Sequence, residues 1–188
     1  ITAHETLLSD ATFTNGSQIA IELIMKGNIG GAAYRTVWVK PTEGDMIEGI
    51  APGKWDAYWA KMSECIVEYT EHSAGRFLSG QGNPKKGDFM HIWDFKASDR
   101  NKFKIAQEKM LKELKKDFEG RFVGFGTYDI NKPDGATHWA AVSGKSEEDH
   151  IILLEKLEKM SEFYSFLDNR GPVEDIRDYE TYILELYE

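Results

Sequence analysis

The residue whose type and setting best suit chemistry is His91. It lies in the segment GDFMHIWDFKASDRNKF, with Phe89, Trp93 and Phe95 at alternating positions. Alternate side chains of a β-strand share one face, so the imidazole is expected among aromatic rings. Burial there disfavours a protonated imidazole, which suits a general base or an axial ligand of a planar cofactor. The alternative is a core histidine whose ring nitrogens are satisfied by a backbone carbonyl or a tyrosine.

A second histidine competes for the same role. His138 directly precedes Trp139 on another expected strand, so the two side chains point to opposite faces and only one of them can line a cavity. The sequence does not decide between His91 and His138. The expected ligand-binding set combines rings that could shape an apolar pocket, and its members are Trp38, Phe89, Trp93, Tyr128 and His138.

Other chemical signatures are weak. No HExxH, CxxC or acidic calcium loop occurs, so no metal site is predicted. His150 follows three acidic residues, but acidic side chains are expected in the first turn of a helix. The run GNIGG lacks the Lys-Ser/Thr of a phosphate-binding loop, and the single cysteine, Cys65, has no adjacent base. No cofactor is therefore predicted. The alternative is a haem with His91 as its axial ligand.

Length and charge narrow the class of protein. The chain has 188 residues and a formal net charge of −9, which suits one acidic domain and argues against general binding to nucleic acid. No apolar run approaches the roughly 20 residues that a membrane span needs. The chain starts at Ile1 rather than Met, so the compartment stays open between cytoplasm and export after removal of a leader.

Apolar periodicity and turn residues divide the chain into alternating strands and helices. Residues 1–31 are expected to form an N-terminal extension with one short helix over Ile19–Met25. Ser98 is expected to cap a helix, with Asp99 in its first turn. The remaining expected elements are strand 34–40, helix 55–74, a hairpin of strands 76–80 and 88–96, helix 98–118, strand 122–130, strand 137–143, helix 147–167 and strand 176–187.

This order of elements predicts an α+β fold of ferredoxin-like βαβ units, with an antiparallel sheet and helices on one face. The second face of the sheet is expected to carry Trp38, His91 and Trp93, and such an aromatic face must also be covered. Closing two sheets into a barrel would cover it. A homodimer or higher homo-oligomer is therefore expected.

Several of these motifs also resemble a known superfamily. VWVKP, a Trp-rich helix, a Gly-Arg-Phe strand and then His91–Trp93 with Ser98–Arg100 resemble the dimeric α+β barrels, in particular NIPSNAP-type and antibiotic-monooxygenase-type modules. The likeness covers residues 34–128, with a weaker half-repeat over 137–187. It implies a barrel domain over 32–188, built from a full βαββαβ module at 32–130 and a βαβ half-repeat at 135–188.

The resemblance leaves the activity open, because the superfamily includes cofactor-free oxygenases, isomerases and haem enzymes. Two functions follow from the sequence. In the first, the barrel binds a hydrophobic or aromatic small molecule, as a cofactor-independent oxygenase or isomerase with His91 as the catalytic residue. In the second, the chain is a non-catalytic assembly protein whose aromatic sheet face is the core of the oligomer.

Overall fold

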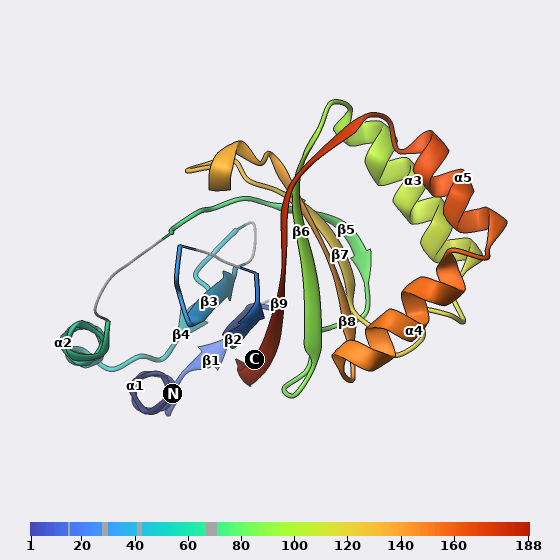
Figure 1. Cartoon of the computed structure of the whole chain (residues 1–188). Coiled ribbons are helices and arrows are strands. Elements are labelled where there is room, and N and C mark those ends of the chain that lie inside the picture. The colour runs from blue at the N-terminus through green and yellow to red at the C-terminus, as the bar shows by residue number, and fades with distance from the viewer. Residues whose placement is uncertain (15, 28–29, 41–42, 67–70) are drawn as a thin grey trace.

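The computed structural model describes residues 1–14, 16–27, 30–40, 43–66 and 71–188. Seven of its strands form one curled antiparallel sheet in the order β3-β2-β9-β6-β8-β7-β5 (Figure 1). These strands are β2 (Gln18–Lys26), β3 (Tyr34–Val39), β5 (Phe77–Gln81), β6 (Phe89–Ala97), β7 (Val123–Thr127), β8 (His138–Gly144) and β9 (Val173–Tyr187). The short strands β1 (Thr12–Phe13) and β4 (Ile47–Glu48) pair with each other. The helices are α1 (Thr2–Leu8), α2 (Lys54–Cys65), α3 (Arg100–Glu113), α4 (Glu147–Leu157), α5 (Ser161–Asn169) and the 3₁₀ turn η1 (Pro133–Gly135).

The centre of the fold is a strand–helix–strand–strand–helix–strand unit. It runs from β6 through α3, β7, β8, α4 and α5 to β9, with β6 lying between β8 and β9. The fold is therefore α+β with ferredoxin-like order, as expected. This unit occupies residues 89–187, however, rather than the expected 32–130. Strand β5 extends it beyond β7, and β2 and β3 extend it beyond β9.

Helices α3, α4 and α5 cover one face of this unit, which we call the helix-bearing face (Figure 1). Asp99 caps the N-terminus of helix α3, and its side chain accepts hydrogen bonds from the backbone N–H groups of Asn101 and Lys102. Its buried stripe includes Phe103 and Met110. The expectation that Ser98 caps this helix is therefore wrong by one residue.

The opposite face of the sheet has its own core. Met90 and Ile92 of β6 pack there with Tyr179 and Ile183 of β9. Trp139 of β8 also packs on this cluster. Apolar side chains thus cover both faces of the central strands, and the curl of the sheet closes around the opposite face.

Three local expectations are wrong. The apolar run Ile19–Met25 is a strand inside the sheet, not a helix, because β2 pairs with both β3 and β9. Residues 76–80 and 88–96 do not form a hairpin, since β5 pairs with β7 and β6 pairs with β8 and β9. The helix expected over 55–74 ends at Cys65, and residues 67–70 of that prediction lie outside the described residues.

The expectation that His91 and Trp93 lie on the face of the sheet opposite the helices is also wrong. His91 contacts His150 of α4, and Trp93 packs against the hydrophobic cluster that contains Phe103 of α3. Both side chains therefore lie on the helix-bearing face. The physical reason is that β6 is apolar on both sides, so alternation alone could not identify which side the helices cover.

Candidate functional site

Three titratable side chains form a continuous chain on the helix-bearing face. Nε2 of His91 lies 2.9 Å from a carboxylate oxygen of Asp178, and Nδ1 of His91 lies 2.8 Å from Nε2 of His150. Both distances are those of good hydrogen bonds. We call Asp178, His91 and His150 the Asp–His–His chain. Its outer end is exposed, because the side chain of Asp178 is 64% accessible, whereas His150 is 2% accessible.

Local structure accounts for this arrangement. His91 lies in the middle of β6, and Asp178 lies on the adjacent strand β9, directly opposite Trp93. Ser146 caps the N-terminus of helix α4, and its hydroxyl accepts a hydrogen bond from the backbone N–H of Asp149. One turn later the buried stripe of α4 starts with His150, so the helix presses this imidazole against β6.

The inner imidazole is held neutral. Burial lowers the pKa of His150 from 6.5 to about 4, and the nearby His91 and Arg121 add to the effect, whereas Asp149 opposes it. Nδ1 of His150 is buried without a hydrogen-bond partner. Its ring packs against Phe89 and Trp93, at centroid distances of 5.7 and 5.8 Å. This environment disfavours a second proton on the ring.

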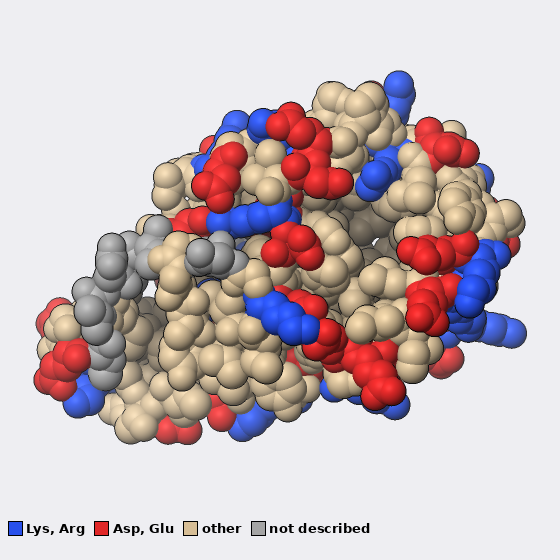
Figure 2. All heavy atoms as spheres, viewed as in Figure 1, with Lys and Arg blue, Asp and Glu red and all other residues tan. Residues whose placement is uncertain are grey.

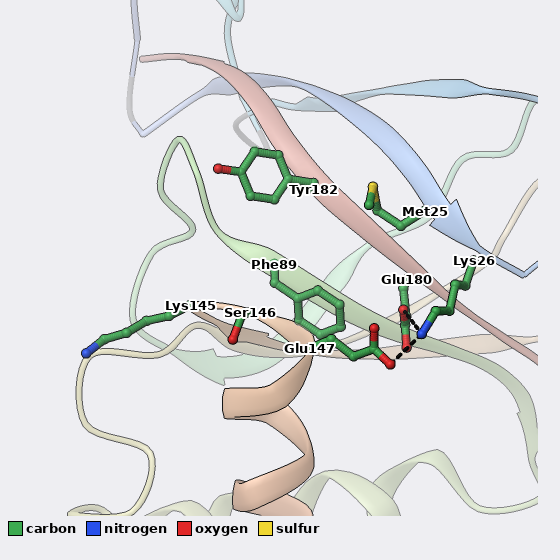
Figure 3. Close-up of a pocket in the computed structure, with 8 residues that line it drawn as sticks. All are labelled: Met25, Lys26, Phe89, Lys145, Ser146, Glu147, Glu180 and Tyr182. Carbon is green, nitrogen blue, oxygen red and sulfur yellow. Dashed lines mark hydrogen bonds and ion pairs between the residues drawn. The ribbon is translucent and has the colours of Figure 1, made fainter.

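A pocket of about 250 Å³ opens beside the Asp–His–His chain, at the N-terminal end of α4 (Figure 3). Two residues of the pocket are neighbours of His91. Phe89 precedes His91 by two residues on β6, and Glu180 is the cross-strand partner of His91 on β9. His91 and Asp178 do not themselves line the pocket. The lining residues are Met25, Lys26, Phe89, Lys145, Ser146, Glu147, Glu180 and Tyr182.

The pocket combines an apolar wall with a charged rim. The wall consists of Phe89, Tyr182 and Met25, and the last two are exposed at 39% and 56%. On the rim, Figure 3 shows the Lys26 ammonium group between the carboxylates of Glu147 and Glu180, with both of which it pairs. Acidic side chains also gather on the surface over this end of α4 (Figure 2). The arrangement suits a small ligand with an apolar body and a polar end.

The opposite face of the sheet carries a separate polar cluster. Asp94 of β6 is fully buried and accepts hydrogen bonds from Tyr128 at 2.7 Å and from Nε of Arg177 at 2.8 Å. Burial raises the pKa of Asp94, and the bonds from Tyr128 and Arg177 only partly offset this. Arg177 also pairs with Glu71 at 2.7 Å. Because both oxygens of Asp94 are bonded within the protein, this cluster offers no free carboxylate oxygen to a ligand.

The structure does not bring the expected ligand-binding residues into one cavity. Phe89 lines the pocket described above, and Trp93 lies beside His91 with ring centroids 3.9 Å apart. Tyr128 bonds Asp94 on the opposite face. His138 lies among Phe95 and Phe125 on the helix-bearing face, and Trp38 packs near α2 against Trp55. Of the expected set, therefore, only Phe89 and Trp93 lie next to His91.

The residues of the Asp–His–His chain do not fit an axial haem ligand. Both ring nitrogens of His91 have protein partners, so neither has a lone pair directed at a cofactor. Within the described part of the chain, no group of three or more His, Cys, Asp or Glu side chains is arranged to hold a metal ion. No helix among the described residues is long and apolar enough to cross a membrane.

His150 and Asp178 are the site residues that sequence reasoning missed. A signal for His150 existed, because it precedes Leu153 and Leu157 by three and seven residues and so shares their buried stripe. No comparable signal existed for Asp178, which is one of several acidic residues along β9. Its role comes from the pairing of β9 with β6.

Comparisons with known proteins identify no family for this chain. No protein-family model matches the chain, and no curated protein matches it. Among solved structures, the chain is similar to a protein from Lactobacillus acidophilus NCFM described as a "putative monooxygenase". The two share 14% identity with a TM-score of 0.49, and the match covers 98% of this chain and 83% of the other.

Proposed function

We propose that this protein binds a small molecule with an apolar or aromatic body in the pocket at the N-terminal end of α4. The observation that carries the proposal is the position of this pocket, whose residues Phe89 and Glu180 are immediate neighbours of His91. A ligand that extends past Glu180 would meet the exposed end of the Asp–His–His chain. An imidazole in such a chain is suited to proton transfer.

The finer proposal is that the reaction is cofactor-independent. Isomerisation by proton transfer and oxygenation of a deprotonated substrate both begin with the movement of a proton, and His91 is the group placed to assist it. A homodimer or higher homo-oligomer remains part of this proposal, because Phe77 next to Trp139 leaves an exposed aromatic surface on the sheet.

A thermal-shift screen of small aromatic compounds tests the binding function. A ligand at 100 times its dissociation constant stabilises the protein by about 2.7 kcal/mol, or roughly 5–10 °C for a chain of this size. The variant Tyr182→Ala removes one wall of the pocket and should abolish the shift. Tyr164→Ala removes an exposed tyrosine from α5 and should leave it unchanged. Equal shifts in both variants would refute binding at this pocket.

One observation favours the second candidate, a non-catalytic assembly protein. Both ring nitrogens of His91 are paired, as expected for a histidine that only completes a core. On this reading, His91→Ala would leave the oligomeric state and any partner intact. It would lower stability by about 1–3 kcal/mol, because its hydrogen-bond partners lose their bonds. Under the first candidate the same variant should also lose the thermal shift given by aromatic compounds, so repeating the thermal-shift screen on His91→Ala separates the two candidates.

A further inference from the structure

We infer that the polar end of the ligand is a cation, so that the pocket at the N-terminal end of α4 takes a small aromatic amine whose ammonium group donates to Glu180. This inference rests on the proposed function, because it names the ligand class of the same pocket. Three observations carry it: the few donors that reach the Glu180 carboxylate, the charge left over on the rim, and the aromatic pair beside it.

The Glu180 carboxylate receives few donors for its position. Its side chain is only 17% exposed, compared with 45% for Glu147. The Lys26 ammonium group donates a hydrogen bond to Glu147 but lies 3.5 Å from Glu180, beyond the range of a good N–H···O bond. Among the described residues, no other side chain donates to the Glu180 carboxylate or forms an ion pair with it. A mostly buried carboxylate is stabilised by each donor that it receives, so Glu180 is the rim group that is open to a ligand.

The rim also keeps one uncompensated negative charge. Glu147 and Glu180 share the single positive charge of Lys26. Lys145 is the other cation that lines the pocket, but Figure 3 shows its side chain extending away from these carboxylates. The N-terminal end of α4 does not supply the missing charge, because its first turn already carries three acidic residues. One further positive charge would therefore balance the rim, whereas an anion would add to the excess.

An aromatic pair lies one step along the sheet from Glu180. Phe89 and Tyr182 are directly opposite each other on β6 and β9, and Glu180 occupies the preceding position of β9 on the same face. The face of an aromatic ring attracts an ammonium group and also stacks with the ring of a ligand. Two residues of a strand span about 7 Å. A ligand ring over this pair can thus reach Glu180 with an ammonium group at the end of a short alkyl chain, as in 2-phenylethylamine.

Isothermal titration calorimetry of the protein with three matched probes tests the ligand class. 2-Phenylethylamine carries the ammonium group, 2-phenylethanol replaces it with a neutral hydroxyl, and 3-phenylpropionate replaces it with an anion. We expect the amine to bind about tenfold more tightly than the alcohol, a factor that corresponds to about 1.4 kcal/mol. Added salt should weaken the binding of the amine but not that of the alcohol. Equal affinity for amine and alcohol, or tighter binding of 3-phenylpropionate, would overturn the ligand class.

Two substitutions locate the ammonium group. Glu180→Gln keeps the shape of the side chain but loses its charge, so the amine should bind about tenfold more weakly and the alcohol as in wild type. Lys26→Met removes the competing cation and should tighten the binding of the amine several-fold. As a control, Glu174→Gln removes the same charge from another position of β9, where the side chain is 65% exposed, and should change neither affinity. An unchanged affinity for the amine in Glu180→Gln would overturn the assignment of this residue.

The outcomes distinguish this inference from the proposed function. If the amine and the alcohol bind equally well and Tyr182→Ala abolishes both, the pocket is a binding site that does not select a cation, and the ligand class is wrong. If none of the three probes binds and the aromatic screen gives no shift that depends on Tyr182, the proposed function fails and the ligand class fails with it.

Discussion

Acid should destabilise this protein through His150, and the effect can be isolated by one substitution. The imidazole is buried against Phe89 and Trp93, which lowers its pKa from 6.5 to about 4. In the unfolded chain the same group protonates near its ordinary pKa. Between these two values the unfolded state binds more protons than the folded state. Stability is therefore fully present above about pH 6.5 and is lost as the pH falls toward 4.

The size of the loss follows from the two pKa values. The pKa of His150 is 6.5 in the unfolded chain and about 4 in the folded protein. When the pH falls from about 7 to about 4.5, this difference in pKa lowers the free energy of unfolding by about 2.5 kcal/mol. His4 adds a loss of the same sign, because burial and the charged N-terminus lower its pKa to about 4 as well. The wild-type protein should thus lose more than His150 alone accounts for.

Urea denaturation at both pH values measures this loss. In His150→Gln, the side-chain amide can still donate to His91 but cannot titrate in this range. The pH-dependent loss should then shrink by about 2.5 kcal/mol, while the contribution of His4 remains. As a control, His72→Gln replaces an exposed histidine and should behave as wild type. An unchanged pH dependence in His150→Gln would refute the linkage argument.

Three further substitutions test packing and capping by urea denaturation. Arg177→Met leaves the buried carboxylate of Asp94 without its cation and should cost about 3–5 kcal/mol; a loss below about 1 kcal/mol would mean that this pair is dispensable. Gly126→Ala places a Cβ in steric overlap with the Trp139 ring, so it should cost about 1–3 kcal/mol and alter indole fluorescence. Asp99→Ala removes the cap of α3 and should cost about 1 kcal/mol, whereas an unchanged midpoint would contradict the capping role.

The fold class could be predicted because many of its elements carry a local signal. Strand β3 lies within the expected span 34–40, and helix α3 has a capped start with a regular buried stripe. The run Ile19–Met25 gave no such signal, since a short apolar stretch suits a buried strand as well as a helix. In the sheet this stretch lies between β3 and β9, and its apolar residues face both sides.

Strand pairing was harder to predict than strand position. The loop GQGNPKKG has the composition of a hairpin turn, yet the strands on either side of it do not pair. Strand β5 instead pairs with β7, more than forty residues later. Such a pairing depends on contacts distant in the sequence, and no local turn residue specifies it. The βαββαβ module lies at residues 89–187 instead of the expected 32–130 because its strand pairings also join segments distant in the sequence.

The site itself was half predictable, and the missing half follows from a physical rule. Alternation correctly placed Phe89, His91 and Trp93 on one face of β6, but it could not say that α4 packs there. The stripe of α4 contained a histidine at a buried position. A buried imidazole needs a hydrogen-bond partner, so His91 on a strand and His150 on a helix stripe each require one. In a fold that packs helices on one face of a sheet, these two histidines can serve as hydrogen-bond partners for each other. The inner end of the Asp–His–His chain, His91 with His150, therefore follows from the sequence once the sheet topology is known. Its outer end, Asp178, depends only on the register between β6 and β9.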